Sequence, residues 1–410
     1  MTLWAGQNGV IHRVRELNSY QKTISNPYTT DNLGAILSVM DWLCRASASG
    51  RIAHTGPPLT MRTLLTAIIK AYEIQGCYQM RNAFNSYGID HVILVKLASA
   101  AVVSWLLGLT ELQTMATISQ VWMDGHPGRI YRSGPNTIPR KGWAAGDAGM
   151  RAVHLALLTR AGQPGAPTAL TMPRWGFFAN TLHKEGFELP KPFSSWVIQN
   201  IFFKVMPVEG HGISSVEAAL IQGKRLRERG YEPGQITKVE TRTTAAANLI
   251  ISKQGPLYNA ADRDHCIQYV IALAFLKGGI PEVQDYEDNG PWATSPNLES
   301  LRAKVLVSED VQFTRDYLDL NKKSVASGLT VHLADGTILE EVLVEFPVGH
   351  TVNPQTVRFV KEKFSRNMSL KFSEMEVKEV LRAAENEDMR ISDFVDLFVR
   401  QTPIETGARL

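Results

Sequence analysis

Apolar side chains in the first half of the chain recur at the spacing of amphipathic helices. From Asp31 onward they fall three and four residues apart, which places them on one helical face, and Thr30 or Asp31 stands before them as a cap. The same spacing predicts a helix capped by Thr60 and ended by a turn at Gly76, and others over residues 91–107, 110–122 and 144–159. No good strand pattern occurs before about residue 190, so this half is predicted to be all-helical.

The pattern changes in the second half. Ser214 or Ser215 is placed to cap a helix that runs to Arg229, and residues 236–242 alternate apolar and polar side chains as a half-buried strand does. Residues 325–346 predict a hairpin whose tight turn is Asp335-Gly336. Helical spacing returns over residues 354–400. The prediction is a mostly α protein with an α/β part, divided into a helical domain (1–198), an α/β domain (199–350) and C-terminal helices that return to the helical domain (351–410).

Composition narrows the function classes. The chain has 410 residues, 44% of them hydrophobic and 20% charged, with a formal net charge of +3. Basic residues are scattered, so nucleic acid and acidic membranes are not indicated as partners. The three cysteines show no metal-ligand spacing and are typical of a reducing compartment. No metal-binding pattern, phosphate-binding glycine loop or serine-hydrolase motif is present, and no metal or cofactor is expected.

Four short stretches carry candidate chemistry, each with a plainer structural reading. Asp262-Arg-Asp-His265 precedes an apolar helix, which Asp262 or Asp264 would cap. The stretch from Lys204 through Glu209 to His211 lies at the predicted domain junction, where ligand sites are favoured. A linker with solvated charges would have the same sequence pattern. The third stretch is Asp90-His91, whose structural reading is a helix cap followed by a packed histidine. The fourth is Arg140-Lys141, which could hold an anion or be a solvated basic pair. Together they offer proton transfer without a cofactor.

These stretches resemble the MmgE/PrpD family, and within it the 2-methylcitrate dehydratase branch. The motifs in the helical half are Thr30-Asp-Asn-Leu-Gly-Ala-Ile-Leu37, Leu59-Thr-Met-Arg62, Ile68-Ile-Lys-Ala-Tyr-Glu-Ile-Gln-Gly76, Asp90-His-Val-Ile-Leu-Val-Lys96, Arg140-Lys-Gly-Trp-Ala-Ala-Gly-Asp-Ala148 and Ala169-Leu-Thr-Met-Pro-Arg-Trp-Gly-Phe177. Those in the second half are Pro207-Val-Glu-Gly-His211, Ala261-Asp-Arg-Asp-His-Cys-Ile-Gln-Tyr269, Lys322-Lys-Ser-Val-Ala326 and Glu345-Phe-Pro-Val-Gly-His350. The resemblance covers about residues 30–370.

The resemblance implies a large helical domain, a smaller α/β lid, a homodimer and no organic cofactor. It also implies a small tricarboxylic acid as substrate, and dehydration of 2-methylcitrate or a longer 2-alkylcitrate to the corresponding aconitate. The residues it places around the cleft as catalytic candidates are His91, Lys141, Lys204, Glu209, His211 and Tyr269. Those expected to bind the substrate are Asp31, Asn32, Arg140, Asp264 and His265. Basic side chains would neutralise the carboxylates, and His, Glu and Tyr side chains would move protons.

The N-terminal segment departs from the family pattern. The family has a longer segment there, with an Asp-rich motif before a His-Pro, whereas this chain has Asn26-Pro27 and residues 1–25 of a different kind. A truncated or diverged member is therefore expected, and two alternatives stay open: decarboxylation of a cis-aconitate-like acid, or an inactive homologue with a binding role. A cytoplasmic location is expected. The mitochondrial alternative rests on the basic residues Arg13, Arg15 and Lys22.

Overall fold

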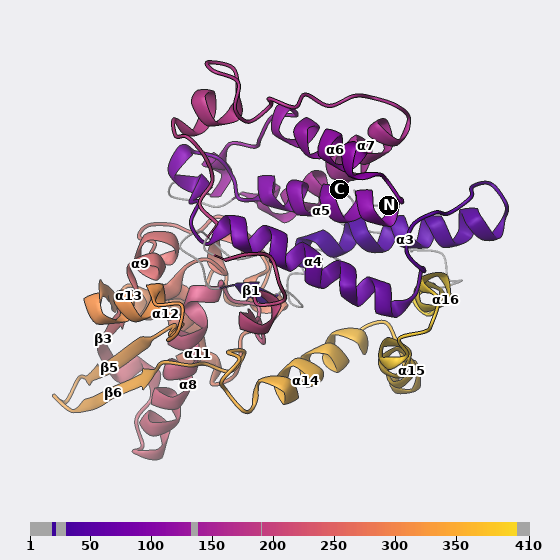
Figure 1. The fold of residues 1–410 in the computed structure, drawn as a ribbon. Helices are drawn as coiled ribbons and strands as arrows, with labels where there is room; N and C mark the ends of the chain where they lie inside the picture. Colours follow the sequence, from indigo (N-terminus) through magenta and orange to yellow (C-terminus); the bar gives the residue numbers. More distant parts are fainter. Residues whose placement is uncertain (1–18, 22–29, 133–137, 190, 400–410) are drawn as a thin grey trace.

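The computed structural model describes residues 19–21, 30–132, 138–189 and 191–399, and its first part is helical (Figure 1). The helices there are α3 (Leu33–Ala48), α4 (Met61–Gln79), α5 (Val92–Leu106), α6 (Glu111–Met123) and α7 (Ala144–Arg160). Helix α4 continues three residues past Gly76, so the predicted end at that glycine was wrong. Thr110 caps α6 as expected, with its side chain accepting a hydrogen bond from the Gln113 amide.

Helix α5 is the central helix of this part. It contacts α3, α4, α6 and α7, and nearly all of its side chains are buried, including the small residues Ala98, Ser99 and Ala100. Small side chains let neighbouring helices approach closely. Because α5 begins directly after His91, its burial fixes that candidate residue in the interior.

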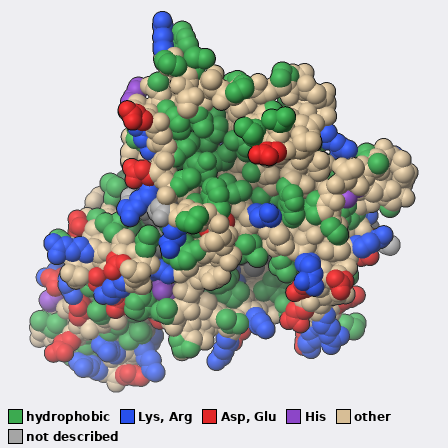
Figure 2. Space-filling view, viewed as in Figure 1, with side chains coloured by type: hydrophobic (Ala, Val, Ile, Leu, Met, Phe, Trp, Pro, Cys, Tyr) green, Lys and Arg blue, Asp and Glu red, His purple; other side chains and the backbone are tan. Residues whose placement is uncertain are grey.

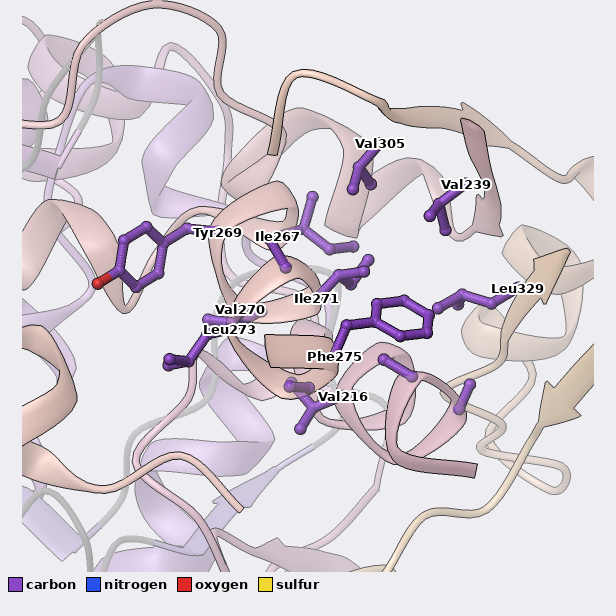
Figure 3. Packing of buried hydrophobic residues seen from close by; sticks show 14 of the residues in the cluster. Val216, Val239, Ile267, Tyr269, Val270, Ile271, Leu273, Phe275, Val305 and Leu329 are labelled. Atoms are coloured by element: carbon purple, nitrogen blue, oxygen red, sulfur yellow. The ribbon is translucent and has the colours of Figure 1, made fainter. Parts of the chain in front are cut away.

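The α/β part contains a four-stranded sheet of order β4-β3-β5-β6. Its strands are β3 (Ile236–Thr243), β4 (Val305–Glu309), β5 (Ser327–Leu333) and β6 (Ile338–Val344), and only the β3–β4 pair is parallel. Helices α8 (Ile213–Glu228) and α11 (Ile267–Lys277) bury its apolar face, and Figure 3 shows Phe275 of α11 pointing toward Leu329 of β5. The predicted strand and hairpin are thus confirmed.

Shorter elements complete the second part. They are α9 (Ala245–Ile251), α10 (Ala260–Arg263), α12 (Pro296–Arg302) and α13 (Val311–Leu318). A three-residue strand at the junction, β2 (Ile201–Phe203), pairs antiparallel with β1 (Ser19–Gln21). The expectation of no strand before residue 190 therefore missed β1, which is too short to show an alternation of its own.

The C-terminal helices are α14 (Thr356–Met368), α15 (Glu374–Glu385) and α16 (Ile391–Asp396). Arg45 of α3 forms a 2.7 Å ion pair with Asp396, and the amide of Ile391 donates to the carbonyl of Leu59 at 3.0 Å. The last helix therefore packs on the helical part, as Figure 1 shows at the yellow end of the chain. None of the helices in the described ranges combines the length and apolarity that a membrane span needs.

Predicted caps of three helices were wrong. Helix α3 begins after Asn32, so Asn32 stands in the cap position in place of Thr30 or Asp31. Helix α8 begins after Gly212, and the hydroxyls of Ser214 and Ser215 instead donate to the Val325 carbonyl and the Ser327 hydroxyl. Helix α11 begins after Cys266, so neither acid of the 262–265 stretch caps it. Asp262 and Arg263 instead end α10, a separate short helix, and Asp264 and His265 follow it in a turn.

Candidate active site

One group of candidate residues joins the helical part to the α/β part. Lys141 lies in a 3-10 turn (Pro139–Gly142), and its Nζ is 3.0 Å from Nδ1 of His265 and also contacts Nε2 of that ring. Nδ1 of His265 in turn contacts a carboxylate oxygen of Asp264. Lys141 and His265 are only 7% and 6% exposed, so water screens the interaction between them only weakly.

A second group is formed by Glu209, His211 and Tyr317. The Glu209 carboxylate accepts a hydrogen bond from the His211 amide at 2.8 Å and lies 2.9 Å from Nδ1 of the same ring. The other ring nitrogen, Nε2, is 3.2 Å from the Tyr317 hydroxyl. The sequence positions this group locally because Gly210-His-Gly212 forms a tight 3-10 turn that Glu209 caps. The result is a buried histidine held between a carboxylate and a phenol.

Electrostatics in the second group favour an ionised glutamate and a protonated tyrosine. Burial alone would raise the pKa of Glu209, but the facing His211 and the nearby Lys204 hold it at about 2. Burial raises the pKa of the Tyr317 hydroxyl well above its usual range, and the Glu209 carboxylate adds to this effect. Tyr317 therefore keeps its proton and is available as a hydrogen-bond donor.

The two groups are adjacent in the fold. The amide of Glu209 donates to the carbonyl of Asp264 at 3.1 Å, which links the segment of the second group to that of the first. Lys204, 7% exposed, is near enough to Glu209 to lower its pKa. The structure thus brings together six of the predicted site residues: Lys141, Lys204, Glu209, His211, Asp264 and His265.

His91 is placed at the start of α5. Nδ1 of its ring is 3.2 Å from the carboxylate of Asp90, and Asp90 also accepts a hydrogen bond from the Val92 amide at 3.1 Å. The Asp90 amide donates to the Pro127 carbonyl at 2.9 Å, which attaches this helix start to the loop between α6 and α7, in which Lys141 lies. The residue in the cap position of α5 is the buried His91, and Asp90, one residue earlier, bonds the first amide of the helix.

The three remaining substrate-binding candidates lie in the helical part. Arg140 is stacked between two aromatic rings, with its guanidinium carbon 5.3 Å from the ring centre of Tyr131 and 4.1 Å from that of Trp143. Asn32 is buried, donates to Gln75 at 2.7 Å and accepts from Ser99 at 2.7 Å. Asp31 precedes it in the 3-10 turn Thr30–Asn32, ahead of α3. These hydrogen bonds give Asn32 a role in holding helices together.

Tyr269 is placed differently from the other catalytic candidates. Its hydroxyl donates to the backbone carbonyl of Asp285 at 2.9 Å, and burial raises its pKa. Figure 3 shows its ring on the opposite side of α11 from Phe275 and Leu329. The tyrosine that contacts His211 is Tyr317, which the sequence reasoning did not single out. Tyr317 lies just before the Lys322–Ala326 motif but 106 residues from His211, so no spacing rule connected the two.

No metal-binding group of three or more His, Cys, Asp or Glu side chains occurs among the residues that the structure describes. The two groups described above bring together two histidines with a carboxylate each, two lysines and a phenol. Such a set can neutralise an anionic ligand and transfer protons to and from it.

Comparison with known proteins defines the class to which this arrangement belongs. Residues 5–190 match the family model of the MmgE/PrpD N-terminal domain, and residues 206–388 match that of the MmgE/PrpD C-terminal domain. The chain belongs to the MmgE/PrpD family. The first match starts at residue 5, so it includes the segment before Asp31 that the sequence reasoning set apart; residues 1–18 and 22–29 lie outside the described ranges.

Relatives of known name extend this result. The chain is 63% identical to the alkylcitrate dehydratase phiI of a fungal species (strain ATCC 74256) over 374 residues, which are 91% of this chain and 74% of the relative. It is 54% identical to alkylcitrate dehydratase phiI of Talaromyces stipitatus, over 92% of this chain and 76% of the relative. It is 44% identical to the 2-methylcitrate dehydratase of Escherichia coli K12, over 91% and 77%.

Proposed function

We propose that the protein is a hydro-lyase that dehydrates a 2-alkylcitrate, either 2-methylcitrate or a longer-chain homologue, to the corresponding aconitate. The observation that carries this proposal is the 63% identity to an alkylcitrate dehydratase along 91% of the chain. Identity over that share of the chain extends across both the helical and the α/β part.

The charges of the site suit a tricarboxylate. A citrate-type acid carries up to three negative charges at neutral pH, and the carbanion-like transition state of the elimination adds charge next to a carboxylate. Lys141 and Lys204 are cations within the cluster, and Arg140 lies one residue from Lys141 with its guanidinium stacked on two rings. We assign these three side chains to the carboxylates, since a stacked guanidinium is pre-organised to bind a carboxylate with two hydrogen bonds.

The proton transfers are assigned to the two histidine groups. His265, oriented by Asp264 and in contact with Lys141, takes the proton of the C–H bond next to a carboxylate. The C=C bond forms as the C–O bond breaks, and the departing hydroxide receives a proton from Tyr317 to leave as water. His211 resupplies Tyr317 across their 3.2 Å contact, while the ionised Glu209 stabilises the ring. His91 is kept as a further candidate that binds or polarises the substrate.

The arrangement of the domains and the oligomeric state are further parts of the proposal. We propose that the helical part and the α/β part act as a domain and its lid, because the Lys141–His265 contact crosses between them. We also propose a homodimer without an organic cofactor. Exposed apolar side chains on α6 and α7, such as Leu112, Met115 and Leu157, offer a surface for a second copy, and Figure 2 shows few charged side chains over the helical part in that view. Three free cysteines suit the cytoplasm.

The decisive experiment is turnover of the purified protein. It is incubated with 2-methylcitrate and with a longer 2-alkylcitrate, and the ultraviolet absorbance of the conjugated product is followed together with carbon dioxide release. Rising absorbance without carbon dioxide supports dehydration, and His211→Ala is the matched inactive control. Carbon dioxide from an aconitate substrate would indicate the decarboxylase alternative. A folded protein that binds these acids without turning them over would indicate an inactive homologue.

A further inference from the structure

Helix α14 has an unusual buried face. Most of the helix is exposed or half-buried, yet its two buried residues are polar, Thr356 at 4% and Lys363 at 3% exposure. They are seven residues apart, which places them on the same face of the helix. A lysine is almost never fully buried unless its ammonium group has a partner. The buried face of α14 is therefore organised by polar contacts, and the partners of those contacts show what it does.

One of the two buried residues contacts Lys204 directly, and the other contacts the turn around Gly349. The ammonium group of Lys363 donates a hydrogen bond to the backbone carbonyl of Lys204, 159 residues earlier in the chain. The hydroxyl of Thr356 accepts from the Gly349 amide at 2.9 Å and donates to the His350 carbonyl at 2.7 Å. A hydrogen bond from an ammonium group to a carbonyl is charge-assisted and stronger than a neutral one.

The turn around Gly349 continues this contact to the residue before Lys204. The amide of Phe203 donates to the Gly349 carbonyl at 2.8 Å. Gly349 has φ of +109°, and a Cβ there would lie 2.1 Å from the carbonyl oxygen of Phe203, so the two backbones meet at the closest approach that glycine allows. The backbone of residues 203 and 204 is consequently held from one side by the 349 turn and by Lys363.

We propose that Lys363 is a positioning residue that sets the location of Lys204, and through it the charge next to Glu209. The inference rests on the proposed function insofar as Lys204 binds a substrate carboxylate. Lys363 fixes the carbonyl of Lys204, the side chain of Lys204 extends from that fixed point, and its ammonium group helps to keep Glu209 ionised. The C-terminal helices thus contribute to the site without contacting the substrate.

The test compares Lys363→Met with Lys361→Met, which removes an exposed lysine from the same helix. Methionine fills the space of the lysine stem but donates no hydrogen bond. Lys363→Met is expected to raise KM and to lower kcat/KM by about tenfold to a hundredfold, as small displacements of positioned groups do. Lys361→Met is expected to match the wild type, and Lys363→Arg to recover part of the loss. Lys363→Met with wild-type KM and kcat/KM would overturn the inference.

A double-variant comparison separates positioning from general stability. In a Lys204→Met background the additional change Lys363→Met should cause no further loss of kcat/KM, because the residue through which it acts is already gone. Full additivity of the two losses would contradict the inference. A crystal structure of Lys363→Met provides a readout independent of turnover: a Lys204 side chain in its unchanged position would overturn the inference even if the wild type dehydrated no alkylcitrate. Failure of the proposed function appears instead as an inactive wild type.

Discussion

The hydroxyl oxygen of Tyr317 lies 3.2 Å from Nε2 of His211, the ring nitrogen that does not face Glu209. Carboxylate, imidazole and phenol therefore follow one another in a row. All three side chains are buried, and the phenol keeps its proton because burial raises its pKa. A proton delivered by the phenol can be replaced from the imidazole, which the ionised carboxylate stabilises. In this row Tyr317 is the group that can act as general acid, and His211 and Glu209 stand behind it to restore its proton.

Replacing Tyr317 tests whether its phenol is the general acid. Tyr317→Phe removes the hydroxyl and keeps the ring, so the fold should be retained while kcat falls by about a hundredfold to a thousandfold, as the loss of a general acid does. KM should change little, since no carboxylate contact is lost. Steady-state kinetics with a 2-alkylcitrate measure both parameters, and a thermal melt confirms that the variant is folded.

Tyr269→Phe is the matched comparison. Its hydroxyl donates to the Asp285 carbonyl, so its removal should cost about 1 kcal/mol of unfolding free energy, with a much smaller loss of kcat than Tyr317→Phe. The reverse order, an inactive Tyr269→Phe and an active Tyr317→Phe, would return the acid role to Tyr269. The pair of variants thus decides between the residue expected from the sequence and the residue that contacts His211.

Glu209 should make stability depend on pH in the acid range. Its pKa is about 2 in the folded protein against an ordinary 4.5, so its ionisation stabilises the fold fully above the ordinary value. That contribution, on the order of 3 kcal/mol, is lost as the pH falls from about 4.5 towards 2. Urea unfolding at several pH values should show the loss in the wild type and a smaller one in Glu209→Gln. Equal pH dependence in both proteins would contradict the assigned pKa.

The sequence predicted the elements whose side chains alternate or repeat over many residues. The alternation in β3 and the Asp335-Gly336 turn both reflect local preferences that the sheet also requires, so local and global structure agree. The caps of α8 and α11 failed because the polar residues next to each helix start make tertiary contacts instead. Lys253 pairs with Asp262 at 2.5 Å, for example, in a contact that no local rule contains.

The candidate site was predictable where one motif holds several of its residues. Glu209 and His211 share a turn, and Asp264 and His265 are neighbours, so the family pattern found them as pairs. Tyr317 belongs to a helix packed on the site from a distant part of the chain, and its contact with His211 arises only from folding. The role of Lys363 was hidden for the same reason.

Loss of the Lys141 ammonium group should weaken binding of the substrate. Lys141→Met removes a buried cation next to His265, and KM for a 2-alkylcitrate should rise about tenfold to a hundredfold, the range for one lost charge-assisted contact. Lys224→Met is the control, because that side chain is 76% exposed on α8. Calorimetric titration with a tricarboxylic acid measures the same effect without turnover. Unchanged affinity in Lys141→Met would remove Lys141 from the carboxylate-binding residues.

The ion pair between Lys96 and Asp124 should dominate the stability of the loop that carries Lys141. Lys96 of α5 is 4% exposed and lies 3.1 Å from Asp124 and 2.7 Å from the Gly125 carbonyl. Burial lowers the pKa of Lys96, and Asp124 opposes that shift. Asp124→Asn leaves the buried ammonium group without a carboxylate, so the free energy of unfolding should fall by about 3 to 5 kcal/mol. Urea denaturation at neutral pH measures this change.

A second ion pair of the Asp124 carboxylate provides the control. Arg151 also pairs with Asp124, at 2.6 Å, but its side chain is 45% exposed, so Arg151→Gln should cost less than about 1 kcal/mol. Adding Lys96→Met to Asp124→Asn removes the uncompensated charge and should recover much of the lost stability. If Arg151→Gln proved as costly as Asp124→Asn, the surface pair would be the stabilising one. The buried lysine would then have no special part in holding the loop.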